Sequence, residues 1–293
     1  MKKVILYYLL LFFTLSFGVI RTKDTFPLEL TDAYGRKIIL KSLPQRIISL
    51  SPSSTEMIFY LGLSEKLLAV NSQCDFPPEA LKKQKIGDVN LNIEKLVELH
   101  PDLIVTEKGL FDNLIYQFDS LGLPVLFLDA GNMEGICNSI LLLGKATGEI
   151  KVSHQLVNSI KERIEEIKII LPNTRKIRVF VEIWPDPVMT VGKKNFINDI
   201  ISLAGGVNIA DDIESNNIQI NSEWVLKRDP EVIILTTPGT KARVYKRPAW
   251  QEITALKSGR VYEIDPDIMV RPTPRVLIGI KQIAHWLYPG LEF

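Results

Sequence analysis

Hydrophobic residues along the chain form short continuous runs that alternate with segments of helical spacing. The runs predict buried strands at residues 46–51, 67–71, 103–105, 125–129, 177–183, 232–235 and 261–264. The spaced segments predict helices at residues 54–63, 110–121, 133–146, 196–204, 222–227 and 273–287. Buried strands that are separated by helices indicate an α/β fold with a mainly parallel sheet in each half of the chain.

Between the two halves lies one long amphipathic segment, Glu149–Leu171, which is followed by Pro172. Its apolar residues recur at spacings of three and four, as on one face of a helix. At about 1.5 Å per residue this helix would span roughly 34 Å, the width of a small domain. We therefore expect two Rossmann-like lobes, residues 28–148 and 173–293, joined by a backbone helix at 149–172 that permits only small lobe motions.

One segment occurs twice without a gap, 129 residues apart. Residues 92–105 align with residues 221–234 and share an asparagine, a glutamate and a proline at equivalent positions. Each copy predicts a short helix with an Asn N-cap, followed by a proline and a buried strand. The repeat indicates that the two halves of the chain are related.

The shared glutamates, Glu94 and Glu223, fall in the first turn of the two repeated helices. One interpretation is that they only complement the partial positive charge of the helix N-terminus, a contribution of about 0.3–1 kcal/mol each. The other interpretation is that two exposed carboxylates, one per lobe, contact a basic partner. The repeat by itself leaves both interpretations open.

Residues 1–18 have the pattern of a signal peptide. Lys2 and Lys3 precede an apolar run from Val4 to Phe17, and small residues follow it. An uncleaved membrane anchor is the alternative, because a span needs only about 17–25 residues. No cysteine lies near the end of the run, so we expect an exported, periplasmic protein without a lipid anchor.

Composition and motifs narrow the possible chemistry. The net charge is +1 with acids and bases interspersed, so we expect a monomer without a nucleic-acid partner. Cys74 and Cys137 could pair after export or remain two unpaired thiols, with Cys137 buried on a helix. The sequence contains no nucleophile elbow or phosphate loop, and its three histidines are too scattered for a metal site. We therefore expect no catalytic residue, metal or cofactor.

Polar residues follow the predicted strands, at the sheet edge where open parallel sheets bind ligands. The candidates for ligand binding are Ser53, Gln73, Asp75, Trp184, Asp267 and Arg271. Ser53 also suits a helix N-cap, and Asp267 and Arg271 could form only a surface ion pair. Trp184 precedes two prolines, in an expected loop where its ring could stack on a ligand.

Four segments resemble the periplasmic cobalamin-binding proteins of ABC importers. They are residues 46–56, residues 74–80, the strand at 101–104 and residues 271–275. The wider family also binds ferric siderophores and haem, and the resemblance covers residues 28–288. It implies two α/β lobes joined by one helix, a cleft that captures a corrinoid, and no covalent chemistry.

The resemblance also implies roles for individual residues. Glu94 and Glu223 match the glutamates with which the family docks on arginines of the membrane permease, the partner of the transport ATPase. Asp267 and Arg271 match positions that hydrogen-bond the amide-bearing edge of the corrin, and Trp184 adjoins a position that packs on the ligand. The best-known cobalamin binder has aromatic residues where this chain has Gln73, Asp88, Glu107, Ile183 and Asn217.

Two alternative functions are compatible with this fold. A receptor for a ferric siderophore or haem would place arginines, or a tyrosine or histidine iron ligand, in the cleft, and the sequence singles out none. A chelatase-like enzyme shares the lobe architecture and would need an acid–base pair. Glu107 and Asp267 are the candidates for that pair.

Overall fold

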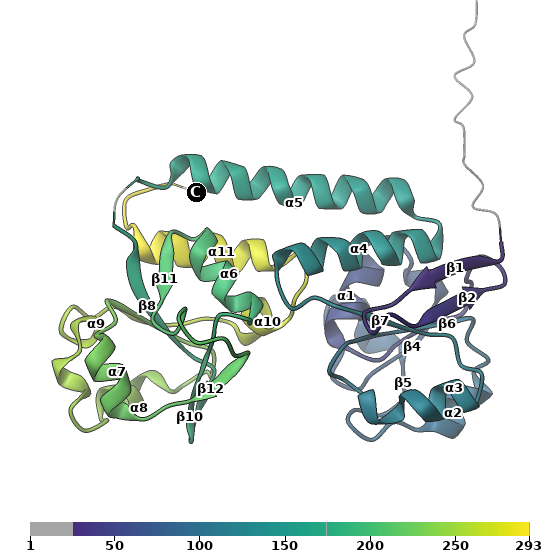
Figure 1. The fold of residues 1–293 in the computed structure, drawn as a ribbon, viewed down its shortest axis with the longest axis horizontal. Coiled ribbons are helices and arrows are strands. Elements are labelled where there is room, and N and C mark those ends of the chain that lie inside the picture. Colours follow the sequence, from purple (N-terminus) through teal and green to yellow (C-terminus); the bar gives the residue numbers. More distant parts are fainter. Residues whose placement is uncertain (1–25, 174, 293) are drawn as a thin grey trace, which may run out of the picture.

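The computed structural model describes residues 26–173 and 175–292, which form two α/β lobes beside each other beneath one long helix (Figure 1). The predicted signal peptide lies outside the described residues. The long helix, α5 (Ile150–Ile170), runs across both lobes and confirms the single-helix connection expected from the sequence. None of the described helices is both long enough and apolar enough to cross a membrane.

The N-terminal lobe contains a parallel sheet with the strand order β5-β4-β3-β6-β7. Its strands are β3 (Ile47–Ser49), β4 (Leu67–Val70), β5 (Gln84–Lys85), β6 (Leu103–Glu107) and β7 (Val125–Leu128). Its helices are α1 (Pro52–Tyr60), α2 (Ile93–Glu98), α3 (Ile115–Ser120) and α4 (Met133–Thr147). Buried residues on both faces of β3, β6 and β7 explain why these strands read as continuous apolar runs.

The C-terminal lobe repeats this plan with the parallel strand order β11-β8-β13-β14. Its strands are β8 (Ile177–Glu182), β11 (Gly206–Asn208), β13 (Val232–Leu235) and β14 (Val261–Glu263). Its helices are α6 (Phe196–Leu203), α7 (Ser222–Arg228), α8 (Lys241–Tyr245), α9 (Thr254–Lys257), α10 (Pro266–Val270) and α11 (Val276–Leu287). The α/β class with mainly parallel sheets is therefore confirmed.

The repeated segments occupy equivalent places in the two sheets. Strand β6 follows α2 and lies between β3 and β7, and β13 follows α7 and lies between β8 and β14. Asn92 and Asn221 cap the two helices, each accepting a hydrogen bond of 2.9 Å from the amide three residues on. Even the left-handed residues that end the helices match, because His100 (φ 44°) and Asp229 (φ 40°) both precede a proline.

Helix α5 packs on helices from both lobes. It contacts α4 of the N-terminal lobe and α6 and α11 of the C-terminal lobe. A Cβ atom on Gly144 of α4 would lie 2.4 Å from Cβ of Ser153, so glycine permits the close approach of α4 and α5. One hydrophobic core, from Leu30 to Leu287, extends through both lobes beneath α5. The shared core makes the connection stiff.

Two antiparallel sheets were missed in the sequence. One is a hairpin of β1 (Leu28–Thr31) and β2 (Lys37–Leu40), in a segment for which we predicted no strand. A second sheet has the order β12-β10-β9, formed by β9 (Trp184–Pro185), β10 (Val188–Val191) and β12 (Asn217–Gln219). The expected loop at Trp184 is therefore a short strand, and Asp267, for which we predicted no helix, lies in helix α10.

Both cysteines are buried free thiols, so the alternative of a disulfide between Cys74 and Cys137 is wrong for this structure. Burial raises the pKa of the Cys74 thiol to about 11, and the Thr55 hydroxyl donates a hydrogen bond of 3.1 Å to its sulfur. The thiol is protonated at neutral pH and serves as a small core residue.

Candidate functional site

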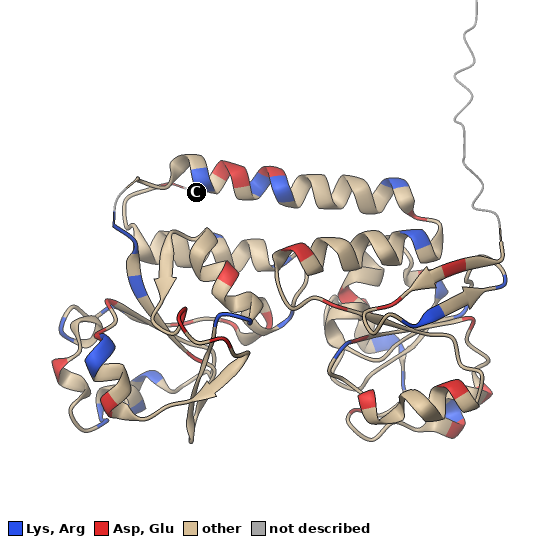
Figure 2. Ribbon diagram, viewed as in Figure 1, with Lys and Arg blue, Asp and Glu red and all other residues tan. Residues whose placement is uncertain are grey.

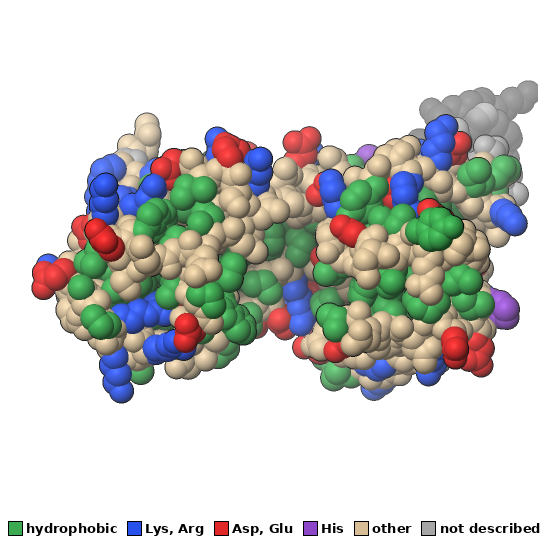
Figure 3. Space-filling model, turned by 60° about the horizontal axis from the view of Figure 1, so that its bottom comes forward, with side chains coloured by type: hydrophobic (Ala, Val, Ile, Leu, Met, Phe, Trp, Pro, Cys, Tyr) green, Lys and Arg blue, Asp and Glu red, His purple; other side chains and the backbone are tan. Residues whose placement is uncertain are grey.

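A cleft with a volume of about 670 Å³ separates the lobes on the side away from α5. The N-terminal lobe supplies residues that follow the carboxyl ends of β6 and β7, as expected for an open parallel sheet. The C-terminal lobe contributes Lys194, Asn216 and Pro272. Figure 3 brings this side forward and shows the hollow, with acidic and basic side chains gathered beside it.

The charged side chains of the cleft nearly balance one another. Three acidic residues (Glu107, Asp112 and Asp129) and two lysines (Lys108 and Lys194) are in its lining. The amine of Lys108 lies 3.2 Å from an oxygen of Asp129, so the two charges form an ion pair. The described lining contains no histidine, and its uncharged polar residues are Tyr34, Asn132 and Asn216.

Tyr34 is the aromatic residue of this lining. Its phenol oxygen accepts a hydrogen bond of 3.0 Å from the amide of Gly109, and its ring packs edge-on against Phe127. Burial and the neighbouring carboxylate of Asp112 raise the pKa of Tyr34. The phenol is therefore protonated at neutral pH, unlike the phenolate that coordinates iron.

Glu107 is held at the end of β6 by two serines from the start of α1. The Ser51 hydroxyl donates a hydrogen bond of 3.3 Å to its carboxylate, and Ser53 bonds to the same group. Burial raises the pKa of Glu107, and the charge of Glu56 raises it further. A carboxyl with a raised pKa can donate a hydrogen bond to a neutral ligand when protonated.

A cluster of ion pairs from both lobes lies next to the cleft. Arg271, beside Pro272 of the lining, places Nη1 at 2.6 Å from Oδ1 of Asp75 and Nη2 at 2.9 Å from Oδ1 of Asp267. The hydrogen bond from Arg271 holds the pKa of Asp75 below its usual range, whereas burial raises the pKa of Asp267. Three candidates from the sequence, Asp75, Asp267 and Arg271, therefore meet at one point.

The same cluster contains a fully buried carboxylate that sequence reasoning did not select. Glu56 of α1 is 0% exposed, and its two oxygens lie 3.3 Å from Nη1 of Arg271 and 3.2 Å from Nε of Arg275. The guanidinium of Arg275 also stacks on the ring of Phe76, at 3.9 Å. Glu56 falls at the start of the helix predicted at residues 54–63, and no sequence pattern indicates that it pairs with Arg271, 215 residues away.

The structure separates the other three candidates from this cluster. Ser53 is buried and bonds to Glu107, at the edge of the cleft. It lies inside α1, whose N-cap is Ser51, so the alternative of an N-cap at Ser53 is wrong. Gln73 is exposed on the loop after β4. Trp184 is 54% exposed, its indole N–H donates to the carbonyl of Asp186, and its ring is not in the described lining of the cleft.

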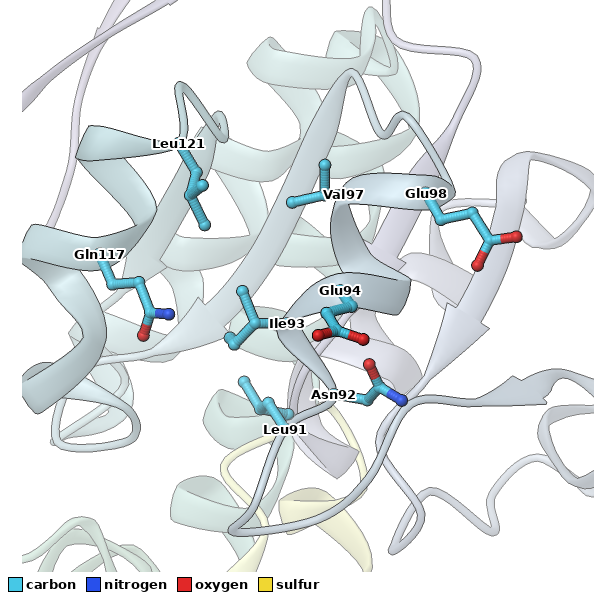
Figure 4. A pocket seen from close by; sticks show the side chains of 8 residues that line it. All are labelled: Leu91, Asn92, Ile93, Glu94, Val97, Glu98, Gln117 and Leu121. Atoms are coloured by element: carbon cyan, nitrogen blue, oxygen red, sulfur yellow. The ribbon is translucent and has the colours of Figure 1, made fainter.

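The glutamates of the repeat lie at the ends of the lobes far from α5, where α2 and α7 are found (Figures 1 and 2). Both side chains are exposed, and within the described residues neither has an ion-pair partner. Glu94 lies in an open groove between α2 and α3 with a volume of about 750 Å³ (Figure 4). The groove is lined by Leu91, Asn92, Ile93, Glu94, Val97, Glu98, Gln117 and Leu121.

Comparisons with known proteins agree with this architecture. The family model for periplasmic binding proteins matches residues 47–268. An uncharacterized ABC transporter substrate-binding lipoprotein of Bacillus subtilis is 36% identical over 276 residues, which cover 91% of this chain and 87% of the relative. The chain therefore belongs to the periplasmic binding protein family, and it is a substrate-binding protein of an ABC transporter.

Two solved structures share the fold at a similar level of identity. The periplasmic vitamin B12 binding protein of Vibrio cholerae has a TM-score of 0.75 and 29% identity, over 84% of this chain and 97% of that one. A possible iron-binding, periplasmic solute-binding protein of Staphylococcus epidermidis has a TM-score of 0.76 and 28% identity, over 84% of this chain and 100% of that one. Both are described as periplasmic binding proteins, one for vitamin B12 and the other possibly for iron.

Proposed function

We propose that the protein captures a corrinoid, such as cobalamin, in the cleft between its lobes and delivers it to the permease of an ABC importer. The observation that carries this proposal is the balance of charge and hydrogen-bonding groups in the cleft. The edge of a corrin presents neutral amides, which need both donors and acceptors. Lys108, Lys194 and Asn132 offer donors, and Asp129 and Asn216 offer acceptors.

An anionic ligand fits this cleft less well. A ferric siderophore or the propionates of haem would require an excess of positive charge, but the lining has three acidic side chains and two lysines. Arg271 adds no free charge, since Glu56, Asp75 and Asp267 already surround it. Haem iron would also need an axial ligand, and the raised pKa of Tyr34 opposes its ionisation.

Arg271 and Asp267 remain our candidates for hydrogen bonds to the ligand edge, and Ser53, Gln73, Asp75 and Trp184 for further contacts. A guanidinium held by three carboxylates can still donate through its remaining N–H groups. Removing one hydrogen bond to the buried ligand costs roughly 1–3 kcal/mol. Arg271→Ala should therefore weaken corrinoid binding by that amount.

We infer that Glu94 and Glu223 dock on basic residues of the permease. Both carboxylates are exposed and unpaired within the described residues, and each lies at the outer end of its lobe. The protein is proposed to act without covalent chemistry. The chelatase alternative lacks support from contacts, because Glu107 bonds to serines whereas Asp267 pairs with Arg271.

Isothermal titration calorimetry with cyanocobalamin and with its truncated analogue cobinamide tests the ligand class. We expect one corrinoid per chain. Haem, a ferric catecholate and a ferric hydroxamate serve as competitors. Tight binding of one of these, together with no heat from either corrinoid, would assign the protein to iron uptake instead.

A further inference from the structure

The two lobes are tied together beside the cleft by one buried carboxylate. Glu56 belongs to α1 of the N-terminal lobe, whereas its two partners, Arg271 and Arg275, lie 215 and 219 residues further along the chain. All three side chains are almost fully buried, with exposures of 0%, 12% and 10%. A contact of this kind exists only while the lobes keep their present spacing.

The tie is not optimised for stability. Oε2 of Glu56 and Nε of Arg275 lie 3.2 Å apart without forming a hydrogen bond to each other, and the carboxylate has one further hydrogen bond, from the side chain of Thr273. Burial raises the pKa of Glu56 even though both arginines lower it. Desolvation of the carboxylate therefore outweighs its ion pairs, as is common for buried salt bridges. Because burial of the Glu56 carboxylate is unfavourable, we look for its role in the placement of its arginine partners.

The ion pairs of Glu56 help to set the position of the Arg271 guanidinium. Among the described residues of its own lobe, this guanidinium forms an ion pair only with Asp267, one helical turn away in α10. Glu56 and Asp75, both from the other lobe, hold its Nη1 atom from two sides. Separating the lobes would leave Arg271 with Asp267 alone and free to turn away from the cleft.

We infer that Glu56 is a positioning residue that places Arg271 beside the cleft and fixes the spacing of the two lobes. Because the Glu56 side chain is fully buried, it acts on the ligand through Arg271. Separation of the lobes on the permease would then dismantle the ligand site and release the solute. The effect on ligand affinity rests on the proposed function, whereas the effect on lobe spacing does not.

The lobe spacing is measured first, without any ligand. Spin labels at Tyr116→Cys on α3 and Lys227→Cys on α7 would report the distance between the outer ends of the lobes by double electron–electron resonance. The buried Cys74 and Cys137, at 0% and 7% exposure, give little background. We expect Glu56→Gln to broaden or lengthen this distance distribution. An unchanged distribution would overturn the inference.

A carboxylate within one lobe provides the matched control. Glu231 also binds two arginines, at 2.7 Å from Arg175 and 3.4 Å from Arg178, and all three residues belong to the C-terminal lobe. Glu231→Gln should leave the distance distribution unchanged. A similar change in both variants would mean a general loss of packing and would also overturn the inference. Should Glu56→Gln fail to fold, Arg275→Met removes the other end of the tie and is expected to widen the distribution.

Cyanocobalamin titrations test the route through Arg271. Glu56→Gln should raise the Kd about tenfold in the wild-type background, since it removes one partner of a buried charge pair. In the Arg271→Ala background it should change the Kd by less than about twofold, because the residue on which it acts is gone. If the double variant raises the Kd by the product of the two single-variant factors, Glu56 acts independently of Arg271. If wild-type protein does not bind cyanocobalamin, only the corrinoid proposal is refuted. The distances between the spin labels would still test whether Glu56 fixes the lobe spacing.

Discussion

The outer ends of the two lobes have the same backbone and different surfaces. Helices α2 and α7 share their Asn caps, their first-turn glutamates and the left-handed residue before a proline. Their last turns differ, because Glu98 of α2 corresponds to Lys227 of α7. Beside α2 lies an open apolar groove, whereas Arg228 of α7 stacks on Trp224 at 4.3 Å.

This difference bears on the two interpretations of the repeated glutamates. A helix dipole acts on a first-turn carboxylate whatever the rest of the surface contains. A partner that docks on both ends meets an acidic end on the N-terminal lobe and a mixed end on the C-terminal lobe (Figure 2). The docking hypothesis therefore predicts unequal contributions from the lobes, and the dipole hypothesis predicts equal ones.

The largest expected effect is on transport. Glu94→Ala and Glu223→Ala should each bind ligand normally and fail to support uptake by the reconstituted importer, with the double variant worse than either. Each substitution can reduce the free energy of docking by about 2–5 kcal/mol, since it leaves a basic residue of the permease unpaired in the interface. Glu94→Ala should cost more, because the neighbouring Glu98 strengthens the field there.

Glu134 offers a matched control for this experiment. It is an exposed first-turn glutamate of α4, two residues after the cap Asn132, as Glu94 is two residues after Asn92. Glu134→Ala removes the same helix-dipole contribution at a helix that lies away from the lobe ends. Transport at the wild-type rate by both Glu94→Ala and Glu223→Ala would reject the docking role.

The repeat and the strand–helix alternation predicted most of the fold because both depend on local sequence. Buried parallel strands are continuous apolar runs, and helix starts have recognisable caps. The antiparallel strands β1, β9 and β12 were missed, since they are short and only partly buried and their partners are set by tertiary packing. Helix α10 begins with Pro266 between turn-forming residues, so it resembles a loop.

The candidate site was predictable only in part. Asp75, Asp267 and Arg271 were selected as strand-end residues, but nothing in the sequence shows that they meet across the two lobes. The missing residues, Glu56 and Arg275, have ordinary local explanations as residues of helix starts. Which charges pair over 196 or more residues depends on how the lobes are placed, and that follows from tertiary contacts that no local sequence pattern reveals.

A second effect concerns the residues that end α2 and α7. Asp229 accepts two hydrogen bonds of 2.8 Å from the amide and hydroxyl of Thr254, whereas the exposed side chain of His100 has no such role among the described contacts. His100→Gly should stabilise the fold by about 0.5–1 kcal/mol, because glycine relieves the left-handed backbone. Asp229→Gly should lose about 1–2 kcal/mol, since the lost bonds exceed that gain.

Chemical denaturation measures both changes in the free energy of unfolding. Asp229→Asn is the control, because asparagine tolerates the left-handed conformation and keeps an acceptor. The two glycine variants need not change the free energy of unfolding by equal amounts. The two changes must, however, have opposite signs. Stabilisation by both would mean that the two hydrogen bonds from Thr254 to Asp229 contribute little to the free energy of unfolding.

The third effect compares Glu56, which links the lobes, with Glu231, which lies within one. Burial raises the pKa of Glu56, so its contribution to stability is present below the unfolded pKa and is lost as the pH rises through the folded pKa. The hydrogen bond from Arg175 lowers the pKa of Glu231, so its contribution is present above the unfolded pKa and is lost as the pH falls. The titratable or charged groups that face Glu56 are Arg271, Arg275, Tyr60 and Glu107.

Unfolding experiments between about pH 4 and pH 7 test this contrast, because glutamine does not titrate. As the pH rises, wild type should lose stability relative to Glu56→Gln and gain stability relative to Glu231→Gln. Both comparisons use one wild-type curve, so other titrating groups cancel. The same direction for both variants would contradict the difference between the two carboxylates.

A fourth, smaller effect is the charge difference between Glu98 and Lys227. Exchanging the two charges, Glu98→Lys with Lys227→Glu, keeps the net charge and both docking glutamates. Exposed charges contribute about 0.2–1 kcal/mol and are screened by salt. The rate of docking on the importer in detergent should become more sensitive to Glu223→Ala and less sensitive to Glu94→Ala at low salt. An unchanged order of the two alanine variants would show that the groove beside α2, and not its charge, makes the lobes unequal.

The smallest expected effect is on the shape of the molecule. Helix α5 contacts helices of both lobes, and one hydrophobic core continues beneath it, so a wide hinge motion would expose buried apolar surface. Adding a corrinoid should therefore change the radius of gyration only slightly in small-angle X-ray scattering. The charges on the outer ends of the lobes could also affect the lobe spacing. Measurements at low and high salt separate closure from electrostatic repulsion, since only repulsion is screened. A large decrease on ligand addition at both salt concentrations would mean that α5 bends or detaches, and that the lobes move as independent bodies.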